Sequence, residues 1–134
     1  MKTHFIKQNS DLATLKYPIT WDILKRYDIS EKMMENVAVT FSMVNAETDI
    51  FKVANSAGDL VINEDVSDGL NLDDSKYSLV YCFKLRDTKK AGHFKGEFVI
   101  DFLDEDAGLG KIKFPLVGHI DIVIGGSITN TTVI

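Results

Sequence analysis

The sequence predicts an all-β fold, an antiparallel β-sandwich of about eight short strands with extended N- and C-terminal segments. Three observations predict it. Apolar and polar side chains alternate with period two along most of the chain, so every second residue faces the same side of a strand. Turn-forming residues separate these stretches at short intervals. No apolar stripe of helix length competes with the alternation.

The first strand carries its apolar side chains at alternate positions, namely Ala13, Leu15, Tyr17, Ile19 and Trp21. Pro18 lies on its other face and cannot donate a ladder hydrogen bond, so we expect this strand at a sheet edge. Residues 23–36 are interpreted as a connection, in which Ser30 is placed to cap one helical turn. The next strand repeats the alternation with Val37, Val39, Phe41 and Met43.

The remaining strands follow the same rule. Two short ones are expected at residues 50–54 and 60–63, divided by a turn at 56–59. Three longer stretches alternate clearly: Tyr77, Leu79, Tyr81, Phe83 and Leu85; then Phe94, Gly96, Phe98, Ile100 and Phe102; then Ile112, Phe114 and Leu116, continued by Ile120, Ile122 and Ile124. The pattern is typical of a sandwich or a barrel.

The two ends depart from the alternation, so we place the sandwich domain at residues 12–124. Residues 1–11 form a polar and mixed N-terminal segment. Residues 125–134 form a C-terminal arm that opens with Gly125-Gly126 and continues with β-branched, almost uncharged residues. Such segments readily add to exposed sheet edges. The arm is therefore either a last strand or frayed end of the domain, or a segment that pairs with a neighbouring subunit through Ile128, Val133 and Ile134.

Composition limits the function classes. The chain has 134 residues, which suits one domain, and a formal net charge of -5. Its longest basic run is Lys89-Lys90, so we expect no binding of nucleic acid. The single cysteine excludes an internal disulfide framework. No apolar stretch approaches the roughly 20 residues of a membrane span, and no secretory signal is expected at the N-terminus.

No residue pattern indicates catalysis, a cofactor or a metal. His119 and Asp121 share a polar face and are expected to be surface partners rather than zinc ligands. The acidic stretch 64–74 fails as an EF-hand, because its twelfth position would be Ser75 instead of a bidentate carboxylate. Cys82 has no histidine nearby in the sequence and is expected to be a half-buried apolar residue. We therefore expect no enzyme.

One outward face of the predicted strands is less polar than solvent exposure favours. Val80 and Cys82 face away from the aromatic stripe of their strand, and Val99 faces away from the aromatic residues of its own strand. Together they are our candidate protein–protein contact surface.

Three stretches, one early in the chain and two in its second half, resemble a known family. They are VTFSM at 39–43, DTKKAGHFKGEF at 87–98, and GKIKFP at 110–115 running into IDI at 120–122. In order and spacing they resemble the N-terminal domain of baseplate upper proteins of tailed bacteriophages, an Ig-like sandwich that also occurs in other phage virion structural proteins. Gly92 suits the turn before a strand in this motif, and Gly96 suits a close approach on the aromatic face.

The resemblance covers about residues 12–124, and none of its motifs is catalytic. It implies an Ig-like antiparallel sandwich that works as an assembly or adaptor module in a head fibre, a capsid decoration, or a tail or baseplate. The implied partners are other phage structural proteins and further copies of the chain. The implied location is the virion, assembled in the host cytoplasm.

Two other classes of function remain. A carbohydrate-binding module on the same fold would need exposed aromatic side chains, for which Tyr27, Phe51 and His93 are the candidates. A subdomain of a host enzyme complex is the third reading of the sequence. Fold analogy favours the phage assembly module over both.

Overall fold

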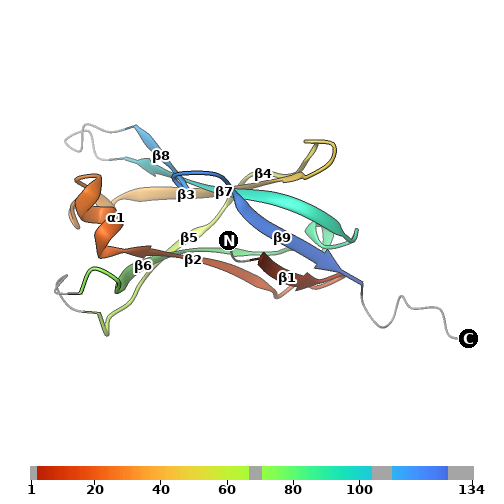
Figure 1. Cartoon of the computed structure of the whole chain (residues 1–134), viewed down its shortest axis with the longest axis horizontal. Coiled ribbons are helices and arrows are strands. Elements are labelled where there is room, and N and C mark those ends of the chain that lie inside the picture. Colours follow the sequence, from red (N-terminus) through yellow and green to blue (C-terminus); the bar gives the residue numbers. More distant parts are fainter. Residues whose placement is uncertain (1–2, 67–70, 104–109, 127–134) are drawn as a thin grey trace, which may run out of the picture.

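The computed structural model describes residues 3–66, 71–103 and 110–126. Two β-sheets pack face to face in it, with one short helix at one end (Figure 1). The prediction of an all-β sandwich is therefore confirmed. Nine strands are present in this part of the chain, against about eight expected.

The larger sheet is built around a long central strand. The strand order of this sheet is β1 (Thr3–Lys7), β9 (Ile120–Gly125), β7 (Gly92–Phe102), β3 (Val37–Asn45) and β4 (Phe51–Ala57), with β7 at the centre. On one side, β7 pairs with β3 along the whole length of β3. On its other side, β7 pairs first with β9 and then with β8 (Lys111–Phe114).

The smaller sheet has the order β2 (Thr14–Thr20), β6 (Ser75–Cys82) and β5 (Asp59–Ile62). Pro18 lies in β2 at an edge of this sheet, as predicted. The expected turn at 56–59 is the point where the chain changes sheets, from β4 to β5, at Gly58. A Cβ atom there would lie 3.0 Å from the Val80 carbonyl oxygen, so a side chain at this crossover would crowd the backbone of β6.

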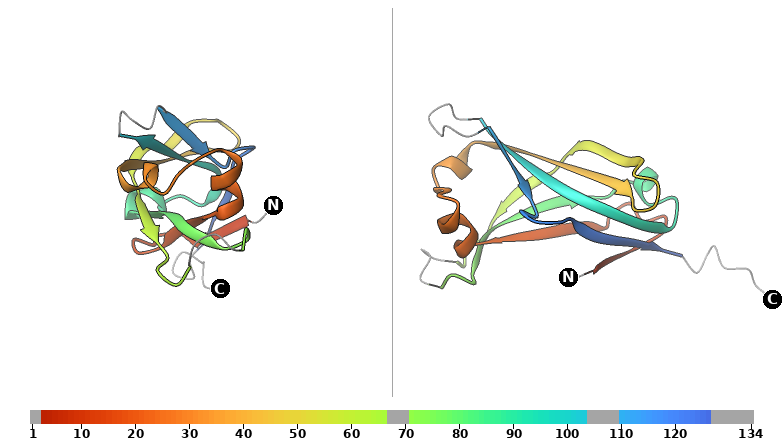
Figure 2. Two further views of the ribbon diagram at one scale, coloured as in Figure 1. Left: turned by 90° about the vertical axis from the view of Figure 1, so that its left-hand side faces the viewer. Right: turned by 45° about the horizontal axis from the view of Figure 1, so that its top comes forward.

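The two sheets lie over one another in layers (Figure 2). Their inward faces meet in an aromatic core. The ring of Phe41 stacks on Tyr81 of the other sheet with 4.6 Å between centroids, and it lies 5.0 Å from Phe98. Gly96 faces this cluster, where a Cβ atom would lie 3.0 Å from the Phe41 ring. The expected close approach at Gly96 is confirmed.

Three local predictions need correction or refinement. Trp21, expected in a strand, begins α1 (Trp21–Arg26), because Thr20 caps the helix by accepting a hydrogen bond from the Ile23 N–H at 3.4 Å. Leu85, expected on an inward face, lies in the 3-10 helix η2 (Leu85–Asp87) and is 47% exposed. Ser30 does cap a helical turn: its Oγ accepts from the Met33 N–H at 3.2 Å, and η1 (Met33–Glu35) follows.

The N-terminal segment is part of the sandwich, which starts at Thr3 rather than residue 12. β1 pairs with β9 in parallel, so the larger sheet is mixed instead of purely antiparallel. Ile6 is buried in the core, while Phe5 points outward and is exposed. A five-residue strand with one buried apolar side chain leaves almost no alternation in the sequence, which explains the wrong boundary.

The C-terminal arm begins inside the fold. Gly125 is the last residue of β9, which runs toward the end of the sandwich opposite α1 (Figure 1). Residues 127–134, with Ile128, Val133 and Ile134, lie outside the described residues, as do 67–70 of the acidic stretch. Within the described parts of the chain, no helix has both the length and the apolar character to cross a membrane.

Candidate functional site

The three predicted contact residues of the sandwich do not form one surface. Val80 and Cys82 flank the buried Tyr81 of β6 and so point away from the core on the smaller sheet. Val99 follows the buried Phe98 of β7 and points away from the core on the larger sheet. The prediction of a single shared patch is wrong, because the sandwich places the two strands in opposite layers.

Each valine has polar cross-strand neighbours. Val80 is in register with Lys16 on one side and Asp59 on the other. Val99 lies between Thr40 and Lys113. These positions are therefore half-buried apolar residues on mixed outer faces, which are ordinary on protein surfaces.

Cys82 is exposed, contrary to the expected half-burial. It is the last residue of β6, and its register partner is Thr14 at the start of β2. The outer face of the smaller sheet carries no second layer of described residues over this position, which explains the exposure.

A stronger candidate is the open side of the sandwich between β3 and β5. β3 pairs with β4 only from Thr40 onward. The carbonyl of Val39 accepts a hydrogen bond from the Gly58 N–H at 2.9 Å, and there the chain leaves for the other sheet. The start of β3 has no strand partner on this side among the residues that the structure describes. β5 lies across the opening as the edge of the smaller sheet.

A groove of about 580 Å³ occupies this opening. Its walls come from η1, the start of β3, the crossover at Gly58, and β5. We call it the β3/β5 groove. It combines backbone of two sheet edges with apolar side chains, the features that recur where one protein adds a strand to another.

The side chains in the β3/β5 groove face inward but are not covered. Ile62 is in register with Tyr77, which is 4% exposed, and so points to the inner face of its sheet. Ile62 itself is 48% exposed. On the opposite wall, Val37 is in register with the buried Phe102 and is only half-buried. Within the described residues, the inner layer of the sandwich is therefore incompletely covered at this end.

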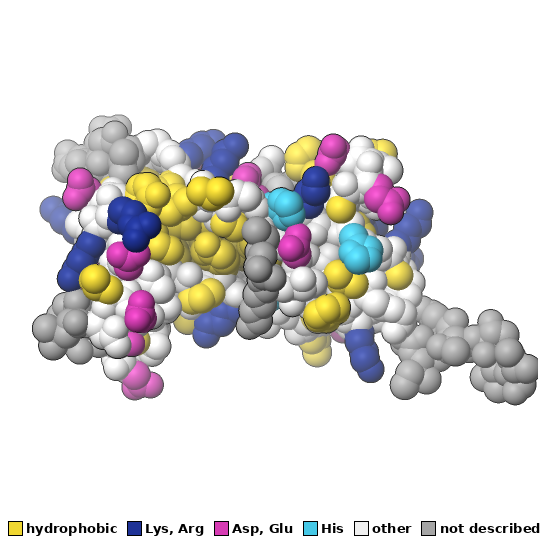
Figure 3. Space-filling view, viewed as in Figure 1, with side chains coloured by type: hydrophobic (Ala, Val, Ile, Leu, Met, Phe, Trp, Pro, Cys, Tyr) yellow, Lys and Arg dark blue, Asp and Glu magenta, His cyan; other side chains and the backbone are white. Residues whose placement is uncertain are grey.

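The other long side of the sandwich near α1 lies between β8 and β2, which are edge strands of the two sheets. Hydrophobic side chains gather on the half nearer α1 in Figure 3. Tyr17 of β2 and Phe114 of β8 lie 6.1 Å apart between ring centroids and so link the two sheets. Phe114 is fully buried, and Tyr17 and Ile112 pack against the core. An aromatic contact therefore bridges the two sheets on this side.

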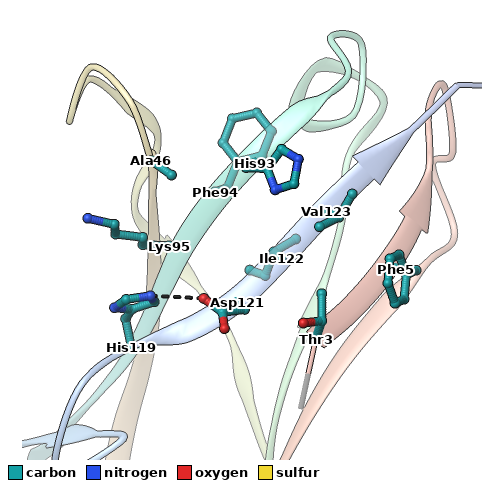
Figure 4. A pocket seen from close by; sticks show the side chains of 10 residues that line it. All are labelled: Thr3, Phe5, Ala46, His93, Phe94, Lys95, His119, Asp121, Ile122 and Val123. Atoms are coloured by element: carbon teal, nitrogen blue, oxygen red, sulfur yellow. Dashed lines mark hydrogen bonds and ion pairs between the residues drawn. The ribbon is translucent and has the colours of Figure 1, made fainter. Parts of the chain in front are cut away.

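A second hollow, of about 460 Å³, lies on the outer face of the larger sheet (Figure 4). Two cross-strand rows form its floor. Phe5, Val123 and His93 make one row, across β1, β9 and β7. The next row contains Asp121 and Lys95.

The expected partnership of His119 and Asp121 is confirmed in this hollow. His119 Nε2 lies 2.9 Å from Asp121 Oδ1, and the two side chains are 38% and 40% exposed (Figure 4). An exposed pair of this kind contributes about 0–1 kcal/mol to stability. Within the described residues, no group of three or more His, Cys, Asp or Glu side chains is placed to hold a metal ion.

A buried hydrogen-bond network at the end of β6 could not be predicted from the alternation pattern. The hydroxyl of Tyr81 donates to Asp87 Oδ2 at 2.6 Å, and the Lys84 backbone N–H donates to the same oxygen at 2.9 Å. Burial, together with the hydrogen bond to Asp87 and its negative charge, raises the pKa of Tyr81 to about 12. The phenol therefore stays neutral at ordinary pH.

The same turn is tied to the N-terminal part of the chain. Thr88 is fully buried, and its Oγ1 donates to the Ser10 carbonyl at 2.7 Å. The Asn9 N–H donates to the Thr88 carbonyl at 2.9 Å. These contacts join β1 and β2 to η2, so this polar cluster supports the fold.

No family model, no curated protein and no solved structure matches this chain.

Proposed function

We propose that this chain is a structural protein of a bacteriophage virion. It works as an Ig-like assembly or adaptor module of a head fibre, a capsid decoration, or a tail or baseplate. The spatial arrangement of the resembling stretches supports the proposal. VTFSM lies in β3, GHFKGEF in β7, KIKF in β8 and IDI in β9. All four meet around β7 in one sheet, so the shared motifs belong to one structural unit.

The β3/β5 groove is the observation that carries the proposed mode of action. It offers a free sheet edge beside uncovered apolar side chains such as Ile62, and such edges bind other proteins by strand addition. The partners are other phage structural proteins and further copies of the chain, and the location is the virion, assembled in the host cytoplasm. The candidate residues Ile128, Val133 and Ile134 belong to the segment that would make such a contact.

Mass spectrometry of particles purified on a density gradient tests this function. We expect the chain to band with capsid or tail proteins at a fixed molar ratio that survives a second gradient and a salt wash. Recovery of the chain only in the particle-free fractions of the same lysate would contradict the proposal.

A carbohydrate-binding module is the second candidate, and the hollow of Figure 4 is the observation in its favour. Phe5 is 77% exposed and lines this hollow together with His93 and Asp121. The other two sequence candidates lie elsewhere, Tyr27 at the end of α1 and Phe51 in β4. Binding on a glycan array that Phe5→Ala abolishes would support this reading, and an array without binding would exclude it for the glycans present.

A further inference from the structure

We propose that the β3/β5 groove is an acceptor for residues 127–134 of a second copy of this chain. In this arrangement, the arm of one copy adds as a strand to the free edge of β3 in the next copy. It places its apolar side chains over Val37 and Ile62. The inference deepens the proposed assembly function and rests on it for its biological setting, and the groove itself supplies the physical argument.

The start of β3 directs backbone N–H and C=O groups to the open side, where an added strand can form hydrogen bonds with them. In an antiparallel strand, the N–H and C=O of one residue point to the same edge, and alternate residues share that edge. The Val39 carbonyl points to the open side, because it accepts from Gly58. The N–H and C=O of Val37 therefore point to the open side as well. This edge at Val37–Val39 lies on the same side of β3 as β4, just before the residues of β3 that pair with β4.

The chemistry of the groove favours an uncharged, β-branched segment. Val37 and Ile62 face the inner layer and need apolar cover. Glu35 and Asp59 also line the groove, so an acidic segment would meet like charge. Residues 127–134 read SITNTTVI, in which six of eight residues are β-branched and none is a charged side chain. β-branched residues suit strands.

The arm of the same copy cannot fill its own groove. Ile124 is in register with Gly92, and Val39 is in register with Ile100, eight residues further along β7. Eight residues of strand span about 26 Å. Gly125 lies beyond Ile124, on the side away from the groove, so the arm starts even farther off. The eight residues 127–134 reach at most about 29 Å when fully extended, which leaves too few of them to pair with β3.

The direction of β9 further prevents residues 127–134 from reaching the groove of the same copy. β9 points away from the end that holds the groove, so a chain leaving it would first have to turn back (Figure 1). The contact is therefore made between copies. Because the arm and the groove are different surfaces, the contact is head-to-tail, and repetition gives a closed ring or an extended row of copies.

Disulfide trapping between two single-cysteine proteins tests the pairing. Both proteins carry Cys82→Ser, which removes the only natural cysteine. One adds Ile134→Cys, and the other, labelled with 15N, adds Ile62→Cys in the groove. The matched control replaces Ile62→Cys with Val61→Cys. Val61 is the adjacent residue of β5, is 44% exposed, and faces the outer side of the sheet.

Under mild oxidation, we expect the mixed-label dimer to form several-fold faster with Ile62→Cys than with Val61→Cys. Unlabelled synthetic peptide SITNTTVI in excess should suppress it. Equal rates at the two positions, or no mixed dimer at either, would overturn the proposal. Sedimentation velocity gives a second readout: the full chain should associate with rising concentration, and the chain ending at Gly126 should not. Association unchanged by the truncation would also overturn the proposal.

Failure of this inference and failure of the virion proposal give different results. A chain present in purified particles without selective trapping at Ile62 would refute the strand exchange alone. Selective trapping by a chain absent from particles would refute the virion role and leave the strand exchange in place.

Discussion

Replacement of Gly96 by alanine tests the packing at the centre of the sandwich. Gly96 lies in β7, and an added Cβ atom would meet two groups from neighbouring strands. It would lie 2.8 Å from Ile122 Cδ1 and 3.0 Å from Cε1 and Cζ of Phe41. The Ile122 methyl is the end of a flexible side chain and can rotate. The Phe41 ring is fully buried between Tyr81 and Phe98 and cannot move as easily.

The expected cost follows from these contacts. Overpacking of a close-packed core costs about 1–3 kcal/mol. Alanine recovers about 0.4–1 kcal/mol because it restricts the unfolded chain more than glycine does. The middle of these ranges gives a net loss of about 1.3 kcal/mol in the free energy of unfolding for Gly96→Ala. A domain of ordinary stability, about 5–15 kcal/mol, remains folded after that loss.

Urea unfolding followed by fluorescence measures the effect, since Trp21 is the only tryptophan and is buried. The matched control is Gly92→Ala in the same strand, where a Cβ atom would lie 3.4 Å from Phe94, an ordinary contact. We expect the control to unfold at the wild-type urea concentration or slightly above it. Equal midpoints for the two variants would refute the packing of Phe41 against β7.

Three further predictions concern the polar contacts of the fold. Tyr81→Phe leaves the buried Asp87 carboxylate without its 2.6 Å hydroxyl donor and should cost about 1.5–3 kcal/mol in urea unfolding; an unchanged free energy would contradict the network. Burial raises the pKa of Tyr17, Tyr77 and Tyr81 above the ordinary 10.0, for Tyr81 to about 12. The contribution of these neutral phenols to the stability of the fold is therefore complete below pH 10 and is lost as pH rises to 12. In a pH series of melting temperatures, Tyr81→Phe should make this loss of stability shallower. Thr20→Ala removes the cap of α1 and should cost about 0.5–1 kcal/mol by the same urea assay, whereas Thr20→Ser should keep most of it.

Much of the fold was predictable because period-two alternation is a local signal. Phe94 to Phe102 alternate without a break, and β7 has the predicted inward face. The signal fails where a short element depends on distant partners. β1 is held by parallel pairing with β9, and Ile6 alone faces the core among its apolar residues. Trp21 continued an alternating pattern, yet the cap from Thr20 starts a helix there.

The candidate site was less accessible to sequence reasoning, since it depends on how the sheets are layered. Alternation identifies Val80 and Val99 as outward residues but cannot tell that they belong to opposite layers. The β3/β5 groove arises because the chain changes sheets at Gly58, so that among the described residues Val37 has a strand neighbour on the β7 side alone. The alternation of β5 predicts that Ile62 faces inward, which is correct. That this inward side chain is nevertheless exposed can be seen only in the structure.

A cryo-EM map of the assembled virion tests the central claim most directly, namely that this sandwich works in the particle through its open side. The account predicts repeated density for the two-sheet sandwich, with a strand from a neighbouring chain filling the β3/β5 groove of each copy. A map that resolves the sandwich with this groove facing solvent in every copy, or a complete particle map without the sandwich, would contradict it.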